Sequence, residues 1–132
     1  MDKRLKKIER VRAVQERLHQ MAEWKLAQLD REKAELADGE KALIEALNQD
    51  EHLQGLFVEA MAKRLNALAR ETDRVNRARI AQNQRLVEEG LRLKRTERMS
   101  AAARRQYLEA LKKDGFEGLL QMLATIDKAS PP

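Results

Sequence analysis

The chain has 132 residues, which suits one domain, and 37% of them are charged while only 3% are aromatic. So few large side chains argue against a compact globule, and the composition is typical of a long helix or coiled coil. No cysteine is present, which excludes a disulfide framework. No apolar run is long enough for a membrane span and none follows the basic N-terminus as in a secretory signal, so we expect a cytoplasmic protein.

Charge is distributed unevenly along the chain. Residues 1–12 carry a net charge of about +4 and residues 92–113 about +6, whereas residues 30–51 carry about −5. A chain that doubles back near residue 50 brings the two basic segments together at one end and leaves the acidic segment at the other. The sequence therefore predicts an elongated, electrically polar molecule.

A first helix is expected over 3–47, because almost nothing interrupts its helical pattern. Leu29, Leu36 and Leu43 recur at every seventh residue, the repeat of a coiled coil. A 3-4 spacing predicts the positions that contact the second helix: Ile8, Val11, Leu18, Ala22, Leu29, Leu36, Leu43 and Ala46, with Gln15, Lys25, Glu32 and Gly39 as weak positions.

A turn is expected over 48–52, where Asn48 and Asp50 favour local side-chain bonds over a continued helix. Two long helices joined by so short a turn fold back on each other as an antiparallel hairpin. Leu53, Leu56 and Phe57 follow the turn and are expected to pack on the end of the first helix, the alternative being an apolar tip offered to a partner.

A second helix is expected over 53–113. A strict 3-4 spacing predicts its contacts: Met61, Leu65, Leu68, Thr72, Val75, Arg79, Gln82, Leu86, Glu89 and Leu93. Ile80, Val87 and Leu91 lie one place away from these positions, which predicts a drift of the repeat and a nearly straight central part. The polar stretch 71–85 fits either a solvated face or a docking face. With Met1 opposite residue 101, an overhang from Ser100 to Lys113 is expected.

A short amphipathic helix is expected over 116–128, since Lys112, Lys113 and Gly115 form a plausible stop before it. It is too short to persist alone in water, so it either folds back over the overhang or pairs with another chain. The predicted fold is thus all-α: one coiled-coil domain over 1–132, a long antiparallel two-helix hairpin with a short C-terminal amphipathic helix.

No pattern in the sequence predicts catalysis, a metal or a cofactor. Glu16 and His19 match one Glu-x-x-His pair of a di-iron bundle, but such a site needs two pairs, and His52, the other histidine, lies in the expected turn. Phosphate-binding loops, nucleophile elbows and zinc spacings are absent from the sequence. The protein is therefore predicted not to be an enzyme.

The basic end is the stronger candidate for function. Its cations allow three interpretations: a solvated face, a site for an acidic protein partner, or a site for nucleic acid. Nucleic acid has the least support, because no aromatic side chains lie among the charges to stack on bases. A homodimeric scaffold with exchanged C-terminal helices is a further alternative.

The chain resembles the FliJ/YscO family of type III export proteins, which are small cytoplasmic antiparallel coiled coils. The likeness rests on the basic N-terminus (KRLKKIERVRAVQERL), the leucine heptads, the turn and the charged segment KRTERMSAAARRQYLEALKK. The turn comes early for this family, and 116–127 is an addition to its pattern.

The resemblance implies a non-enzymatic stalk or adaptor, flagellar or injectisome, that works as a monomer or weak homo-oligomer. Its terminal end would contact the export ATPase ring, its turn end would face the export gate protein, and its sides could escort export chaperones. The implied ring-contacting residues are Lys3, Arg4, Lys6, Lys7, Arg10, Arg95, Arg98, Arg104 and Arg105.

Overall fold

The computed structural model describes residues 3–49 and 55–129, and every described residue is helical. Helix α1 spans Lys3–Gln49 and helix α2 spans Gly55–Ala129, and the two pack against each other, so the predicted all-α class is confirmed. The chain divides into two units. We name Met1–Arg17 with Leu91–Pro132 the terminal unit, and Leu18–Gly90 the central unit.

The composition explains why both helices are so long. The sequence is rich in Ala, Leu, Glu, Lys and Arg, which lose little side-chain freedom in a helix, and its two prolines are the last two residues. Each helix also carries ion pairs between successive turns, such as Arg12 to Glu16 and Arg74 to Glu71. These local preferences favour helix, and burial between α1 and α2 adds to them.

In the central unit, α1 and α2 run antiparallel around a thin apolar core. Ala22, Leu29 and Val75 are buried, and Val75 is completely enclosed. The Gln82 side-chain amide, also buried, donates a hydrogen bond of 3.1 Å to the Ala22 carbonyl. An ion pair of 2.5 Å between Arg79 and Asp30 lies beside this core.

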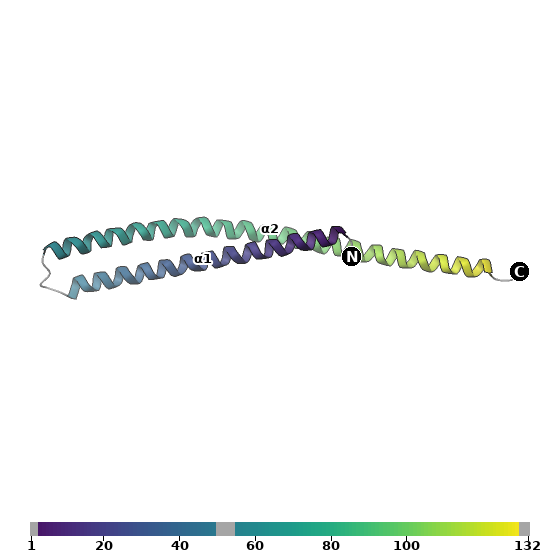
Figure 1. Cartoon of the computed structure of the whole chain (residues 1–132), viewed down its shortest axis with the longest axis horizontal. Coiled ribbons are helices and arrows are strands. Elements are labelled where there is room, and N and C mark those ends of the chain that lie inside the picture. Colours follow the sequence, from purple (N-terminus) through teal and green to yellow (C-terminus); the bar gives the residue numbers. More distant parts are fainter. Residues whose placement is uncertain (1–2, 50–54, 130–132) are drawn as a thin grey trace. The chain divides into compact units, whose positions relative to one another are not determined.

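In the terminal unit, the start of α1 lies antiparallel to the part of α2 that follows residue 91 (Figure 1). Leu5 is buried from α1, whereas Thr96, Ser100 and Ala103 are buried from α2. The α2 side chains are small, so this interface buries little apolar surface and includes two hydroxyl groups.

The strict 3-4 pattern predicted for α2 is confirmed. All ten predicted contact positions from Met61 to Leu93 are buried or half-buried, and the same spacing continues through Thr96, Ser100, Ala103 and Tyr107. The expected drift of the repeat is wrong, because Ile80, Val87 and Leu91 are exposed.

The contact stripe predicted for α1 is only half right. Ile8, Gln15, Ala22, Leu29, Leu36 and Leu43 are buried or half-buried, but five of the alternate positions lie one residue later than predicted, and Glu32 is exposed. Arg12, His19, Leu26, Glu40 and Leu47 take the places expected for Val11, Leu18, Lys25, Gly39 and Ala46. Val11 and Leu18 are exposed, because the observed 3-4 repeat turns them away from α2.

The expected turn differs from the structure where it can be compared. α1 continues through Asn48 and Gln49, while the remainder of the predicted turn, Asp50 to His52, lies outside the described residues. Leu53 and the side chain of Leu56 also lie outside the description, and Phe57 is 48% exposed. Phe57 is thus exposed, and its predicted packing on the end of α1 is not confirmed.

The predicted stop near Lys113 and the separate helix over 116–128 are both wrong, because α2 continues without a break to Ala129. The described glycines have no positive φ, so Gly115 is an ordinary helical residue. A single glycine costs a helix only about 1 kcal/mol, and strong helix formers surround this one.

The predicted overhang begins too early, and the segment after Gly115 does not fold back over it. Ser100 is 1% exposed and Ala103 is also buried, so the paired part of α2 reaches Tyr107. Beyond it lies the tail, which we define as residues 108–126 of α2; all of these residues are exposed. No helix among the described residues is long and apolar enough to cross a membrane.

Candidate interaction surface

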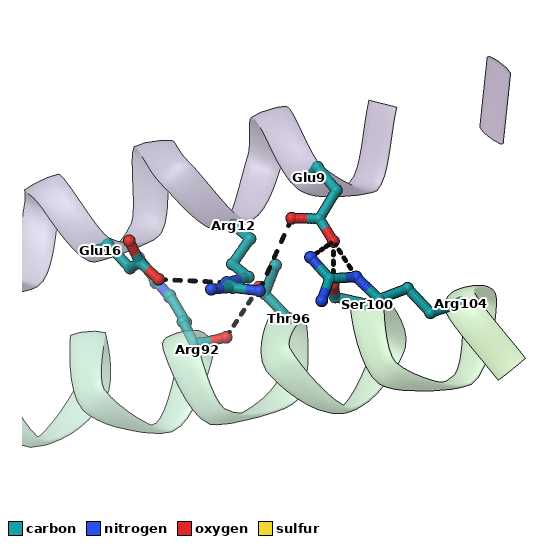
Figure 2. Close-up of polar contacts among 7 residues, drawn as sticks. All are labelled: Glu9, Arg12, Glu16, Arg92, Thr96, Ser100 and Arg104. Carbon is teal, nitrogen blue, oxygen red and sulfur yellow. Dashed lines mark hydrogen bonds and ion pairs between the residues drawn. The ribbon is translucent and has the colours of Figure 1, made fainter. Parts of the chain in front are cut away.

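The terminal unit is organised around the carboxylate of Glu9, which reaches from α1 towards α2 (Figure 2). The Ser100 hydroxyl donates a 2.6 Å hydrogen bond to Glu9 Oε1. Arg104 donates to the same oxygen from Nε at 3.0 Å and approaches it with Nη2 at 2.9 Å. One carboxylate oxygen therefore joins two α2 side chains that are one helical turn apart.

Small residues of α2 allow this approach. Ser100 and Ala103 are buried against α1 and leave room for the carboxylate of Glu9, whose side chain is 26% exposed. The hydrogen bond from Ser100, followed by the charge and hydrogen bonds of Arg104, lowers the pKa of Glu9 below its ordinary value of 4.5. Glu9 is therefore held in its charged form, as the geometry requires.

Arg12 extends this network along α1 (Figure 2). Its guanidinium lies 3.6 Å from Glu9 Oε2 and donates from Nε to Glu16 at 3.1 Å. The hydrogen bond and charge of Glu16, together with the charge of Glu9, raise the pKa of Arg12. Thr96 lies close by, and its hydroxyl donates to the Arg92 carbonyl one turn earlier in α2. Charged and hydroxyl groups thus take the place that leucines occupy in a typical coiled coil.

All nine residues predicted to contact a partner lie in the terminal unit, and all are exposed. Seven of them point away from the contact between the helices, since successive residues are rotated by about 100°. On α1 these are Lys3, Lys6, Lys7 and Arg10, and on α2 they are Arg95, Arg98 and Arg105. The structure therefore places cations on the outer side of both helices, and we call these seven residues the basic collar.

The other two predicted residues flank the contact stripe and bond across it. Arg4 donates to the side chain of Gln106 at 3.5 Å, and Arg104 binds Glu9. Both therefore help to hold α1 against α2, a role that the sequence did not indicate. Glu9 was missed altogether, although one signal was present: it is one of only two acids in residues 1–12, among six Lys and Arg.

The polar stretch 71–85 contributes side chains to the contact with α1, as the 3-4 spacing predicted for Arg79 and Gln82. Arg79 pairs with Asp30, Arg74 lies 3.8 Å from Glu32, and Gln82 bonds to the backbone of α1. These side chains face the acidic part of α1 within the central unit. The stretch therefore helps to join the helices and is not simply a solvated face.

The central unit also has an open groove of about 510 Å³. Its lining contains Leu18, Met21, Ala22, Trp24, Lys25, Gln82, Arg85 and Glu89. Trp24, which belongs to this lining, is 61% exposed. Glu89 is the one carboxylate of the lining, which contains no serine, cysteine or histidine.

The Glu-x-x-His pair does not form part of a metal centre in the described residues. Glu16 bonds to Arg12, and His19 Nδ1 lies 3.0 Å from Glu23. Residues 3–49 and 55–129 contain no group of three or more His, Asp or Glu side chains placed to hold a metal ion.

Comparison of the chain with protein-family models, curated proteins and solved structures finds no match. By its fold alone, the chain is a two-helix protein with paired antiparallel helices and a basic terminal unit. The resemblance to type III export proteins stays a prediction.

Proposed function

We propose that this protein is a non-enzymatic coiled-coil adaptor whose terminal unit binds an acidic protein partner through the basic collar. The observation that carries the proposal is the placement of exposed cations on the outer side of both helices, from two segments far apart in the sequence. The 3-4 burial pattern of α1 and α2 supports knobs-into-holes packing of a coiled coil.

The partner we propose is the ATPase ring of a type III export apparatus in the cytoplasm. A ring that surrounds the helix pair can contact both outer sides at once, and a collar of cations suits such a partner better than a one-sided patch does. Charge complementarity of this kind raises the association rate and orients the complex. The export gate protein and export chaperones are further proposed partners, by resemblance alone.

The test compares three double charge reversals in pull-downs with the purified export ATPase. Arg95→Glu with Arg98→Glu alters the outer side of α2, and Lys6→Glu with Arg10→Glu alters the outer side of α1. Both are expected to reduce binding at least about tenfold, because each reversal replaces attraction by repulsion. Circular dichroism should show unchanged helicity for both variants.

The matched control is Lys63→Glu with Arg64→Glu, which reverses two exposed cations of the central unit. Its binding should equal that of the wild type. Loss of binding in only one of the two collar variants would indicate a one-sided partner and would contradict the ring. Unchanged binding in both would remove the basic collar as the contact surface.

Double-stranded DNA is the competing ligand for the same cations. Binding through phosphate contacts weakens steeply with salt, whereas stacking on bases needs exposed aromatic rings. Tyr107, the one aromatic residue near the collar in sequence, is half-buried in the α1–α2 contact. Titration with duplex DNA at about 0.05 M and about 0.15 M salt decides the matter: affinity that persists at the higher salt would favour DNA over the adaptor.

A further inference from the structure

The tail of α2 extends past the start of α1 (Figure 1), and its apolar side is exposed. At about 100° per residue, its large apolar residues after Gly115 fall on one side of the helix. They are Phe116, Leu119, Leu120, Met122, Leu123 and Ile126, and each is between 49% and 64% exposed. Gln121 and Thr125 lie on the opposite side. The tail is thus an amphipathic helix with its apolar side in solvent.

The area of this apolar side matches the contribution of one subunit to a small dimer interface. A half-exposed side chain of this size presents on the order of 100 Å², so the six present roughly 600 Å² per chain. If each copy covered the six side chains of the other completely, the two would bury roughly 1,200 Å² together, which is the lower limit for a specific interface. Such an interface supports a weak, concentration-dependent dimer.

Four of the six residues have the spacing of a coiled coil. Phe116, Leu119, Leu123 and Ile126 follow one another at intervals of three, four and three residues. In an antiparallel pair, one register places Phe116 against Ile126 of a second copy and Leu119 against Leu123. Each of the four residues then has an apolar partner in the second copy, and two-fold symmetry repeats both pairs.

The cations that precede the apolar residues in α2 decide between a parallel and an antiparallel pair. Lys112 continues the same 3-4 spacing, and Arg98 and Arg105 belong to the basic collar on the same helix. A parallel pair would place Lys112 against its own copy and bring two collars together, which is unfavourable. An antiparallel pair places the two sets of cations at opposite ends of the contact.

We propose that this protein forms an antiparallel homodimer through the tail, with Phe116 packed on Ile126 and Leu119 on Leu123 of a second copy. The contact lies apart from the residues of the collar, so the dimer does not depend on the proposed export role. The occupant of the apolar side is another molecule of this chain.

Sedimentation equilibrium of the full chain, from about 1 µM to about 1 mM, tests the association over the range of weak to moderate dimers. The average mass is expected to rise from 15.3 kDa towards twice that value. Leu119→Glu with Leu123→Glu should stay monomeric, because it places four carboxylates in the contact. The control Gln121→Glu with Thr125→Glu adds the same charge on the polar side and should dimerise as the wild type does.

Disulfide capture tests the orientation, and the chain suits it because it contains no cysteine. In the antiparallel register the two copies of residue 116 are offset by about 15 Å along the helix axis, too far for a disulfide. Phe116→Cys alone should therefore give no covalent dimer, whereas its mixture with Ile126→Cys should give one. A covalent dimer of Phe116→Cys alone would show that the two copies of residue 116 lie opposite each other and would overturn the proposed register.

Two further results would overturn the dimer itself. One is a wild-type chain that stays at 15.3 kDa over the whole concentration range. The other is a Leu119→Glu, Leu123→Glu variant that associates as strongly as the wild type. The second result would place the contact on another surface.

Discussion

The two units use the same pair of helices but hold them together differently. The central unit buries Leu29 and Val75 between its helices and places its ion pairs beside them. The terminal unit buries Leu5 from α1 against small residues of α2 and binds Glu9 to Ser100 and Arg104. Apolar burial depends little on pH or salt, whereas a charged network depends on both. The comparison therefore predicts that the two units respond differently to the same perturbation.

The largest effect is expected from the apolar core of the central unit. Leu29→Ala should lower the free energy of unfolding by about 3 kcal/mol, because it removes buried methyl groups and leaves a cavity. Chemical denaturation followed by circular dichroism measures the change. Ile80→Ala is the matched control: Ile80 is 64% exposed, so its loss should stay within about 0.5 kcal/mol. Equal losses in the two variants would contradict the observed contact stripe.

The buried amide of Gln82 gives an intermediate effect. Gln82→Ala removes the hydrogen bond to the Ala22 carbonyl and leaves a gap, which should cost about 1 kcal/mol. Gln82→Leu also removes the bond but fills the space, and since the carbonyl belongs to α1, it can keep its helical partner. We therefore expect Gln82→Leu to be at least as stable as the wild type in the same denaturation assay. A larger loss for Leu than for Ala would show that the hydrogen bond outweighs the packing.

The contact positions that the sequence predicted well are those on which hydrophobicity and spacing agree. In α2, Met61, Leu65 and Val75 fixed a strict 3-4 repeat, and the polar positions Thr72 and Gln82 followed from it. In α1, the apolar residues Val11 and Leu18 outweighed Arg12 and His19 in the prediction, yet the latter two are the half-buried residues.

The physical reason is that Arg12 and His19 have partners on their own helix. Glu16 pairs with Arg12, and Glu23 lies beside His19, so each can bury its carbon atoms while its nitrogen atoms stay bonded. A hydrophobicity pattern does not register such compensation. The same holds for Glu9, because its role in joining the helices depends on Ser100 and Arg104, which are more than ninety positions away.

The sequence pattern also failed to predict that α2 continues past Gly115. Lys112, Lys113 and Gly115 together have the composition of a helix end, but a glycine commonly ends a helix by adopting a positive φ, and Gly115 does not adopt one. The charges of residues 1–12 and 92–113 predicted a basic end, and the seven residues of the basic collar are among the nine that the family resemblance implied. The division of the basic collar between the outer sides of α1 and α2 could be assigned only from the observed contact stripes of both helices.

The smallest effect is expected from Glu9 and depends on pH. The pKa of Glu9 is lowered in the folded protein, so its contribution to stability is present above the ordinary value of 4.5 and is lost as the pH falls through the lower, folded value. Glu9→Gln should therefore melt a few degrees below the wild type at pH 7, and the difference should disappear under acid conditions. Melting curves of both proteins between pH 7 and pH 2 measure this.

The control for Glu9 is Glu71→Gln. The pKa of Glu71 is also lowered, chiefly by its hydrogen bond from Arg74, but that bond joins two residues of α2 and does not connect α2 to α1. An exposed pair within one helix contributes little to stability, so Glu71→Gln should change the melting temperature less than Glu9→Gln does. Equal pH profiles for the two variants would mean that the Glu9 network does not hold the terminal unit together. In that case the small buried residues Ser100 and Ala103, together with Leu5, would be sufficient to pair the helices there.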